Sequence, residues 1–132
     1  MIELDLNHFD EMVGHGLREF PNECCGLLAS KDGVPVKVFP MRNLDASPVS
    51  YQLDAKEQLQ VFDQIDDAGW DLFAIYHTHT HSEAYPSDTD RNQAFYPDAY
   101  YMVLSLSDRE HPVLRAFRIM DGDVSEEELK VG

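Results

Sequence analysis

The chain has 132 residues, of which 43% are hydrophobic, and its 25 acidic and 10 basic residues give a formal net charge of -15. This composition suits a single globular domain over residues 1-132 and excludes both a disordered chain and a nucleic-acid-binding surface rich in Lys and Arg. No apolar run approaches the ~20 residues that cross a bilayer and no signal peptide is visible, so we expect a cytoplasmic protein without a membrane partner.

The acidic excess has two interpretations, which the sequence leaves open. Salt screens the repulsion between carboxylates, so the composition fits a high-salt cytoplasm, but an ordinary acidic enzyme can carry the same balance. Unfolding measured from low to molar KCl separates the two, because full stability without salt contradicts the high-salt hypothesis.

The first elements in chain order are a short strand and a helix. Residues 1-6 alternate apolar and acidic side chains and predict an edge strand. Asn7 is expected to cap a helix that ends before Pro21. Gly14 and Gly16 each weaken such a helix by about 1 kcal/mol relative to Ala, so they indicate either close packing or a bend.

A hairpin and a second helix follow. Residues 25-30 and 34-39 predict strands joined by a turn at positions 32-33, and turn-forming residues fill positions 41-50. A brief strand at 51-53 then leads into a helix over 55-68. The capping box expected for this helix comprises Asp54 and Glu57. Its apolar stripe comprises Leu59, Phe62 and Ile65, with Val61 beside it.

The second half of the chain predicts three strands, at residues 72-76, 100-106 and 113-120, and a short helix at 89-95. Residues 124-131 either pair back as a strand or begin a short helix. Together the elements predict an α+β or three-layer α/β domain, in which a curved mixed sheet has a helix packed on each side.

The candidate metal-binding residues begin directly after the apolar run 72-76. His77 and His79 are two residues apart, so on an extended strand both imidazoles point to the same side. Ser87 and Asp90 have the spacing of a helix capping box, which returns Asp90 towards the histidines. Two imidazoles and one carboxylate, with a fourth position open, form the ligand set of a catalytic zinc site. We therefore expect one Zn²⁺ per chain.

His81 is a competing ligand. On a fully extended segment it shares a face with His77 and His79, so it can replace one of them as a ligand or contact a ligand without binding the metal itself. The spacing alone leaves this alternative open.

The spacing of these residues (His-x-His, seven residues, Ser, two residues, Asp) resembles that of the JAMM (MPN-plus) metalloproteases. A second segment, Pro21-Asn22-Glu23-Cys24-Cys25-Gly26-Leu27-Leu28, is similar to the glutamate segment of that family. The sequence Glu83-Ala84-Tyr85-Pro86-Ser87 resembles the bacterial branch that acts on small ubiquitin-like sulfur-carrier proteins. Thr80 departs from the Pro that often follows the second histidine of the family.

The resemblance implies roles for individual residues. His77, His79 and Asp90 are the metal ligands, which selects His79 over His81. Glu23 is the general base, with the carboxylate of Glu83 as a competitor. Ser87 donates to the oxyanion of the transition state. Its hydroxyl is also the expected helix cap, and the two roles need not exclude each other, although whether one Oγ fills both at once is left open. We likewise expect that Asp90 cannot bind metal and complete the capping box.

Cys24 and Cys25 suggest a different chemistry, that of a thiol peptidase, which requires an oriented Cys-His pair. Cys25 begins an apolar strand and is expected to be buried as a small core residue. Cys24 is the candidate that can face the site. No disulfide is expected between adjacent cysteines.

The resemblance implies a zinc-dependent peptidase or isopeptidase that hydrolyses the bond after the C-terminal Gly-Gly of a ubiquitin-like sulfur carrier and releases cysteine. One alternative is a non-catalytic scaffold module of MPN type, which lacks the ligand set. Another is a PHP-type phosphoesterase, which also uses His-x-His motifs but needs a larger barrel. The sequence leaves the oligomeric state open, a homo-oligomer included.

Overall fold

The computed structural model describes all 132 residues and contains three helices and eight strands. In chain order these are β1 (Ile2–Leu4), α1 (Leu6–Glu19), β2 (Cys25–Lys31), β3 (Val34–Met41), α2 (Ala55–Asp67), β4 (Asp71–His79), α3 (Asp88–Asn92), β5 (Tyr100–Ser105), β6 (Val113–Met120), β7 (Asp123–Glu127) and β8 (Leu129–Val131).

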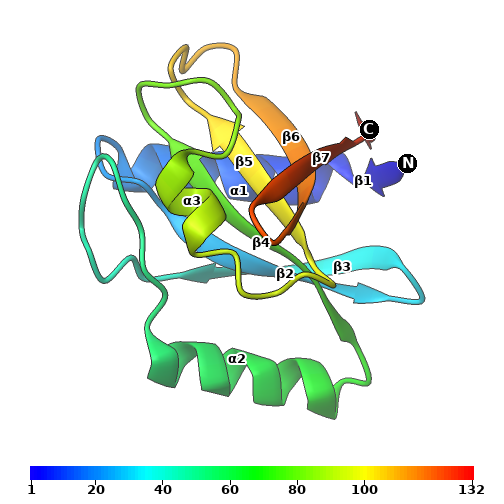
Figure 1. Ribbon diagram of the computed structural model, residues 1–132. Coiled ribbons are helices and arrows are strands. Elements are labelled where there is room, and N and C mark those ends of the chain that lie inside the picture. Colours follow the sequence, from blue (N-terminus) through cyan, green and yellow to red (C-terminus); the bar gives the residue numbers. More distant parts are fainter.

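A mixed six-stranded sheet with the order β3-β2-β4-β5-β6-β7 forms the centre of the molecule. Only β4 and β5 are parallel, and every other neighbouring pair is antiparallel. The two ends of the chain pair separately, β1 with β8, and lie side by side in Figure 1. The open sheet excludes the barrel of a PHP-type phosphoesterase.

Each face of the sheet is covered by one long helix, as the sequence predicts, because strand side chains alternate between two apolar cores. One core includes Met12 of α1 together with Ala74 and Tyr76 of β4. The other includes Val61 and Ile65 of α2 and the intervening β4 residue Ile75. Figure 1 shows α1 behind the sheet and α2 below it.

The first helix begins two residues earlier than expected. Its N-cap is Asp5, whose side chain accepts from the backbone N–H of Asn7 at 2.8 Å, so Asn7 lies inside the helix. Gly16 permits close packing, because an added Cβ would lie 2.9 Å from both Leu106 Cδ1 and Thr78 Cγ2. Gly14 makes no such approach, since its Cβ would meet only Arg18 Nη1 at 3.4 Å.

The second helix has its expected limits but differs in two side chains. Asp54 caps it, whereas Glu57 Oε1 accepts from the backbone N–H of Arg42 and so does not close a capping box. Leu59 was expected in the buried stripe but is 62% exposed. Ile65 of the expected stripe is buried and Phe62 is half-buried, while Val61, expected beside the stripe, is buried in place of Leu59.

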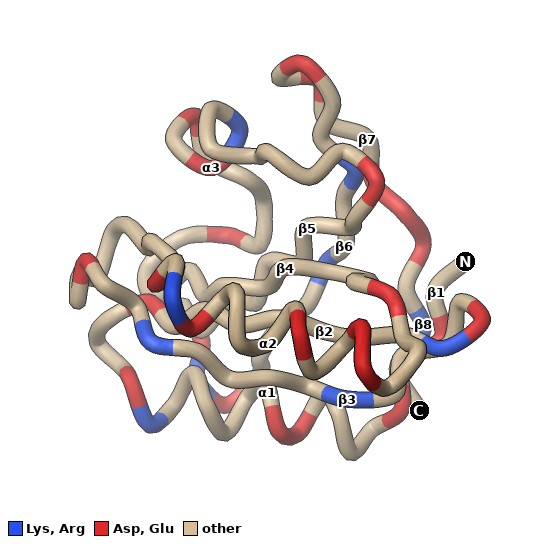
Figure 2. Tube along the Cα trace, turned by 90° about the horizontal axis from the view of Figure 1, so that it is seen from below, with Lys and Arg blue, Asp and Glu red and all other residues tan.

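The sequence left open whether residues 124-131 form a strand or a short helix, and the structure decides between the two. Residues 123–127 and 129–131 form strands, not a helix, and the turn before them places Asp121 and Gly122 at positive φ. The hairpin turn at Asp32 and Gly33 has the same pair of positive φ values. Acidic residues are spread along α1, α2 and the loops (Figure 2). No helix is long and apolar enough to span a bilayer.

Candidate metal centre

The two histidines lie at the end of β4, which is longer than the apolar run alone predicts and extends to His79. His77 pairs with Cys25 of β2 on one side and with Val103 of β5 on the other, so it is held in the middle of the sheet. His77 and His79 alternate with Tyr76 and Thr78, and therefore point to the α2 face together with Ile75.

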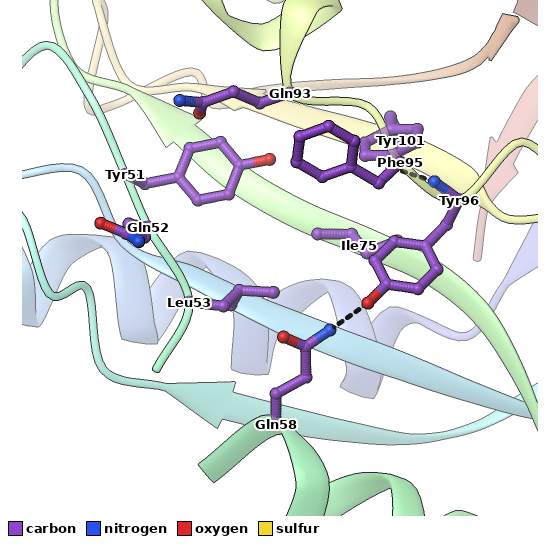
Figure 3. Close-up of a pocket in the computed structure, with 9 residues that line it drawn as sticks. All are labelled: Tyr51, Gln52, Leu53, Gln58, Ile75, Gln93, Phe95, Tyr96 and Tyr101. Carbon is purple, nitrogen blue, oxygen red and sulfur yellow. Dashed lines mark hydrogen bonds between the residues drawn. The ribbon is translucent and has the colours of Figure 1, made fainter. Parts of the chain in front are cut away.

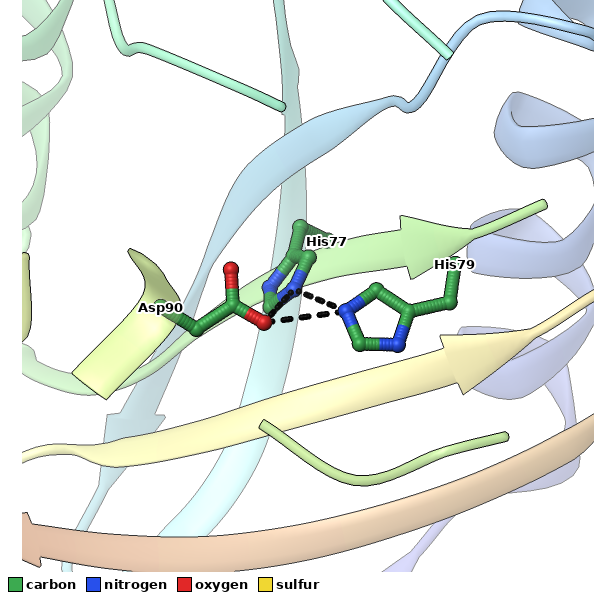
Figure 4. A group of neighbouring side chains, drawn as sticks. All are labelled: His77, His79 and Asp90. Carbon is green, nitrogen blue, oxygen red and sulfur yellow. Dashed lines mark hydrogen bonds and ion pairs between the residues drawn. The ribbon is translucent and has the colours of Figure 1, made fainter. Parts of the chain in front are cut away.

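His77, His79 and Asp90 converge on one point, and all three are buried. The two Nε2 atoms lie 3.2 Å apart, and Asp90 Oδ2 lies 3.0 Å from His77 Nε2 and 2.9 Å from His79 Nε2. Figure 4 shows the carboxylate reaching from α3 to both rings on β4. Two segments that are separate in sequence thus supply three ligand atoms facing one another.

Asp90 is fixed by the first turn of α3. Ser87 Oγ accepts from the Asp90 N–H at 3.1 Å, and Asp90 Oδ2 accepts from the Ser87 N–H at 2.9 Å, which completes the capping box. Asp90 completes the capping box and faces the histidines at once, because the same Oδ2 atom makes both contacts. A carboxylate oxygen has two lone pairs, and Oδ1 adds further acceptor capacity.

The tautomer of His79 is set by a backbone contact that the sequence did not reveal. His79 Nδ1 lies 2.8 Å from the carbonyl oxygen of Glu83, which can only accept, so Nδ1 carries a proton in either charge state. In the neutral ring Nε2 is therefore the nitrogen that can bind a metal, whereas in the protonated ring Nε2 donates to Asp90. His77 Nδ1 is buried without a partner. The ring of Tyr51 stacks on His77, with centroids 4.4 Å apart, and holds it in position.

Burial and hydrogen bonding act in opposite directions on the pKa values of the three residues. Burial lowers the pKa of His77. Burial acts in the same direction on His79, but its hydrogen bonds to Asp90 and the Glu83 carbonyl outweigh it and raise its pKa. Burial disfavours the charge of Asp90, yet hydrogen bonds from both histidines hold the pKa of that carboxyl well below its usual range. Asp90 is therefore ionised and ready to bind a cation.

These donors fit a zinc ion. Zinc binds nitrogen and oxygen ligands at about 2.0–2.2 Å, so neighbouring ligand atoms in a tetrahedral site lie roughly 3.3 Å apart. The three separations of 2.9 to 3.2 Å are within a few tenths of an ångström of that value. The orientation of His79 Nε2 and the ionised state of Asp90 satisfy the chemistry as well. The group is thus suited to hold a metal, as its spacing predicts.

Glu23 lies beside this group. The β2–β4 ladder pairs Cys25 with His77 and continues through a hydrogen bond from the Thr78 N–H to the Cys24 carbonyl, which aligns Glu23 with His79. Glu23 is only 5% exposed, and its Oε1 has no hydrogen-bond partner. Burial raises its pKa to about 8, His79 acts against this shift, and Asp90 adds to it. A buried carboxyl with a pKa near neutrality is suited to proton transfer.

Two competing residues lie outside the group. His81 is exposed; its Nδ1 contacts Thr80 Oγ1 and its ring lies 5.9 Å from that of Phe20. Glu83 is exposed and contributes its backbone carbonyl rather than its carboxylate.

Both thiols are buried and unsuited to nucleophilic attack. Burial raises the pKa of the Cys24 thiol to about 12 and raises that of Cys25 as well. Cys25 is on the metal face, whereas Cys24 packs in the core on the α1 side, so the expectation that Cys24 faces the site is wrong. The register explains this, because Cys25 is directly opposite His77.

An aromatic cavity of about 320 Å³ is lined by side chains from α2, β4, β5 and the loops near them (Figure 3). Tyr51 lines it and also stacks on His77, so one side chain is shared between the cavity and the metal group. Its wall contains no charged residue. The lining comprises Tyr51, Gln52, Leu53, Gln58, Ile75, Gln93, Phe95, Tyr96 and Tyr101. Tyr51 was not found from sequence, because no local pattern connects it to a histidine 26 positions later.

Comparison with known proteins agrees with this geometry. The model for prokaryotic homologs of the JAB domain matches residues 5–120. The CysO-cysteine peptidase of Mycobacterium tuberculosis is 45% identical over 122 residues, which cover 91% of this chain and 84% of that protein.

Solved structures agree as well. A protein of Desulfitobacterium hafniense superposes with a TM-score of 0.91 at 35% identity, covering 100% of this chain and 93% of that one. A structure described as a JAMM metalloprotease-like zinc site in the proteasome and signalosome has a TM-score of 0.64 at 14% identity, covering 100% and 98%. The fold is therefore that of the JAMM, or MPN, class of domains. The chain belongs to the prokaryotic JAB-domain family.

Proposed function

We propose that this protein is a zinc-dependent peptidase that hydrolyses the bond after the C-terminal Gly-Gly of a ubiquitin-like sulfur carrier and releases cysteine from a carrier-cysteine adduct. The convergence of His77, His79 and Asp90 beside a buried glutamate carries the proposal. The 45% identity to a CysO-cysteine peptidase supports the substrate class. A non-catalytic scaffold has no need of this ligand set, which is complete here.

His77, His79 and Asp90 would hold the zinc ion, which would supply Lewis-acid activation of a water molecule and of the scissile carbonyl. Glu23 takes a proton from the attacking water and passes it to the leaving amine, so one water yields a new carboxyl and a free amine. The pKa of Glu23 near 8 applies to the metal-free site. A nearby divalent cation stabilises the carboxylate and moves that pKa down, towards the form that acts as a base.

Ser87 can cap α3 and assist catalysis at once. Its Oγ accepts from the Asp90 N–H with a lone pair, which leaves the hydroxyl hydrogen free to donate. That donor supports the oxygen of the scissile carbonyl as negative charge develops on it. The cavity beside Tyr51 offers an uncharged, aromatic surface to the carrier residues that precede the scissile bond.

The test combines metal content with cleavage. We expect purified protein to contain close to one zinc per chain and to release cysteine from mycobacterial CysO extended by a C-terminal cysteine, as followed by mass spectrometry. A chelated sample should be inactive. Glu23→Gln should keep its zinc and lose activity, whereas Glu83→Gln, which alters an exposed carboxylate nearby, should remain active.

Zinc-loaded protein that leaves the adduct intact would contradict the proposal. Full activity of Glu23→Gln would remove Glu23 as the base while leaving the metal site standing.

A further inference from the structure

The loop between β3 and α2 is held together by the side-chain amide of Asn43. Its Nδ2 group donates to the carbonyl oxygens of Glu23 and Ser50, each at 3.0 Å. Its Oδ1 atom accepts from the backbone N–H groups of Asp45 and Gln52, also at 3.0 Å. A side-chain amide offers two N–H groups and two oxygen lone pairs, so all four are used here. These bonds fix the half-buried side chain in one orientation.

Two of the four bonds enclose Tyr51. Asn43 binds the carbonyl of the residue before Tyr51 and the N–H of the residue after it. The Tyr51 ring is buried and stacks on His77, with centroids 4.4 Å apart and 19° between the ring planes. A histidine that binds metal usually donates its other ring N–H to a partner, which sets the orientation of the ring. His77 Nδ1 is buried and has no such partner, so the stacked Tyr51 ring orients the imidazole instead.

A third bond of the Asn43 amide reaches Glu23. The Glu23 carbonyl accepts from Asn43, and the Glu23 N–H donates to the Ser47 carbonyl at 2.8 Å, so both backbone polar groups of Glu23 bond to the same loop. The Glu23 side chain is buried, and its Oε1 has no hydrogen-bond partner to hold the carboxyl. The position of the carboxyl therefore depends on the Glu23 backbone, and through it on the loop.

A turn within the loop accounts for only one of the four bonds. The contact from Asn43 Oδ1 to the Asp45 N–H spans two residues and is an Asx turn, which a serine can form as well, though more weakly. The other three bonds join residues 7, 9 and 20 positions away. A serine side chain is one atom shorter and has a single hydroxyl, so it cannot make them all. Asn43→Ser thus separates the turn from the links to Glu23 and Tyr51.

We propose that Asn43 is a positioning residue of the metal centre, which keeps the proposed base Glu23 and the candidate ligand His77 in a fixed relation through the loop. The inference rests on the proposed function for the role of Glu23, and it adds a residue that touches neither the metal nor the reacting atoms. Loss of a group that orients a ligand from outside costs about 10- to 100-fold in metal affinity or activity, and we expect an effect of that size here.

The first measurement uses chelated protein and does not depend on activity. Amide hydrogen exchange at Glu23 reports the opening of its bond to the Ser47 carbonyl. In Asn43→Ser this amide should exchange about 10-fold faster than in the unmodified protein, because hydrogen bonds that close the loop are lost. The Thr78 amide, which donates to the Cys24 carbonyl at 3.0 Å between β2 and β4, should keep its exchange rate.

The second and third measurements use zinc. Competition with a chelator of known affinity should show that Asn43→Ser binds zinc about 10- to 100-fold more weakly than the unmodified protein. At saturating zinc, kcat on the carrier-cysteine adduct should also fall about 10- to 100-fold, because a small displacement of the base is enough for such a loss.

Asp108→Ser is the matched control. Asp108 also forms an Asx turn, to the Glu110 N–H at 3.1 Å, but its side chain bonds only within the loop after β5. This variant should equal the unmodified protein in all three measurements.

Zinc affinity or zinc-saturated kcat of Asn43→Ser equal to that of the unmodified protein would overturn the inference. An equally large rise in exchange at Thr78 would also overturn it, since Asn43 would then support the sheet as a whole rather than the metal centre. Failure of the zinc-loaded, unmodified protein to cleave the adduct would instead contradict the proposed function, while zinc affinity and hydrogen exchange would still test the role of Asn43.

Discussion

Ser87 and Asp90 hold each other through two hydrogen bonds, each donated by the backbone N–H of one residue to the side chain of the other, at 2.9 and 3.1 Å. Asp90 Oδ2 is at the same time within 3.0 Å of both imidazole Nε2 atoms. The N-terminal turn of α3 is thus part of the candidate metal centre, and the stability of this short helix is coupled to the placement of the Asp90 carboxylate.

Replacing Ser87 separates capping from catalysis. Ser87→Ala removes the cap and should lower the free energy of unfolding by about 0.5–2 kcal/mol, whereas Ser87→Gly should cost only a few tenths of a kcal/mol. Both variants lose the hydroxyl donor, so both should lose roughly 100- to 1,000-fold in kcat on the carrier adduct. Urea unfolding and steady-state kinetics measure the two effects. A nearly active Ser87→Gly would mean that the serine serves the helix only.

Asp90→Asn should abolish most zinc binding and alter the acid stability of the metal-free protein. The pKa of Asp90 is held far below its usual value of 3.8 in the folded chain. Its contribution to stability is therefore present above pH 3.8 and is lost as the pH falls through the folded pKa. As the pH falls from about 5 to about 2.5, the free energy of unfolding of the chelated parent should decrease more steeply than that of chelated Asp90→Asn. Parallel curves would contradict the ion-paired state of Asp90.

Glu23 gives the opposite pH dependence. Its pKa rises from 4.5 to about 8 on folding, so the folded chain holds the proton more tightly than the unfolded chain. The contribution is fully present below pH 4.5 and is lost as the pH rises to about 8. In chelated samples, Glu23→Gln should therefore gain stability over the parent across this window and keep that advantage above it.

Zinc provides the control for the Glu23 measurement. A bound divalent cation favours the carboxylate, so the difference in urea stability between the parent and Glu23→Gln should shrink when both are loaded. A difference that does not change with pH in chelated samples would show that Glu23 is not desolvated as the structure indicates.

Local spacing was sufficient to predict that His77, His79 and Asp90 come together, and to predict most elements of the fold. His77, His79 and Asp90 come together because strand alternation and a capping box are short-range geometries. The limits of β6 and the long body of α2 follow the apolar pattern for the same reason. The sequence did not predict which of two adjacent residues, such as Cys24 and Cys25, points to which face of the sheet.

Contacts between distant segments explain what the sequence missed. Which of Cys24 and Cys25 faces the metal depends on the β2–β4 register, and the exposure of Leu59 depends on how α2 is turned against the sheet. Tyr51 reaches His77 only through the path of the 43–53 loop. None of these relationships leaves a periodic signal along the chain.

The two glycines of α1 should respond in opposite ways to the same substitution. At Gly14 an added Cβ meets only the end of the flexible Arg18 side chain, so Gly14→Ala should gain up to about 1 kcal/mol from helix propensity. At Gly16 the Cβ would lie 2.9 Å from Thr78 Cγ2 and Leu106 Cδ1, both in buried residues, so overpacking should cost about 1–3 kcal/mol. Urea unfolding of both variants measures these two changes in the free energy of unfolding. Because Thr78 lies between the two histidine ligands, Gly16→Ala should also bind zinc more weakly than Gly14→Ala. Equal stability of the two variants would show that α1 does not pack closely against β4 at this point.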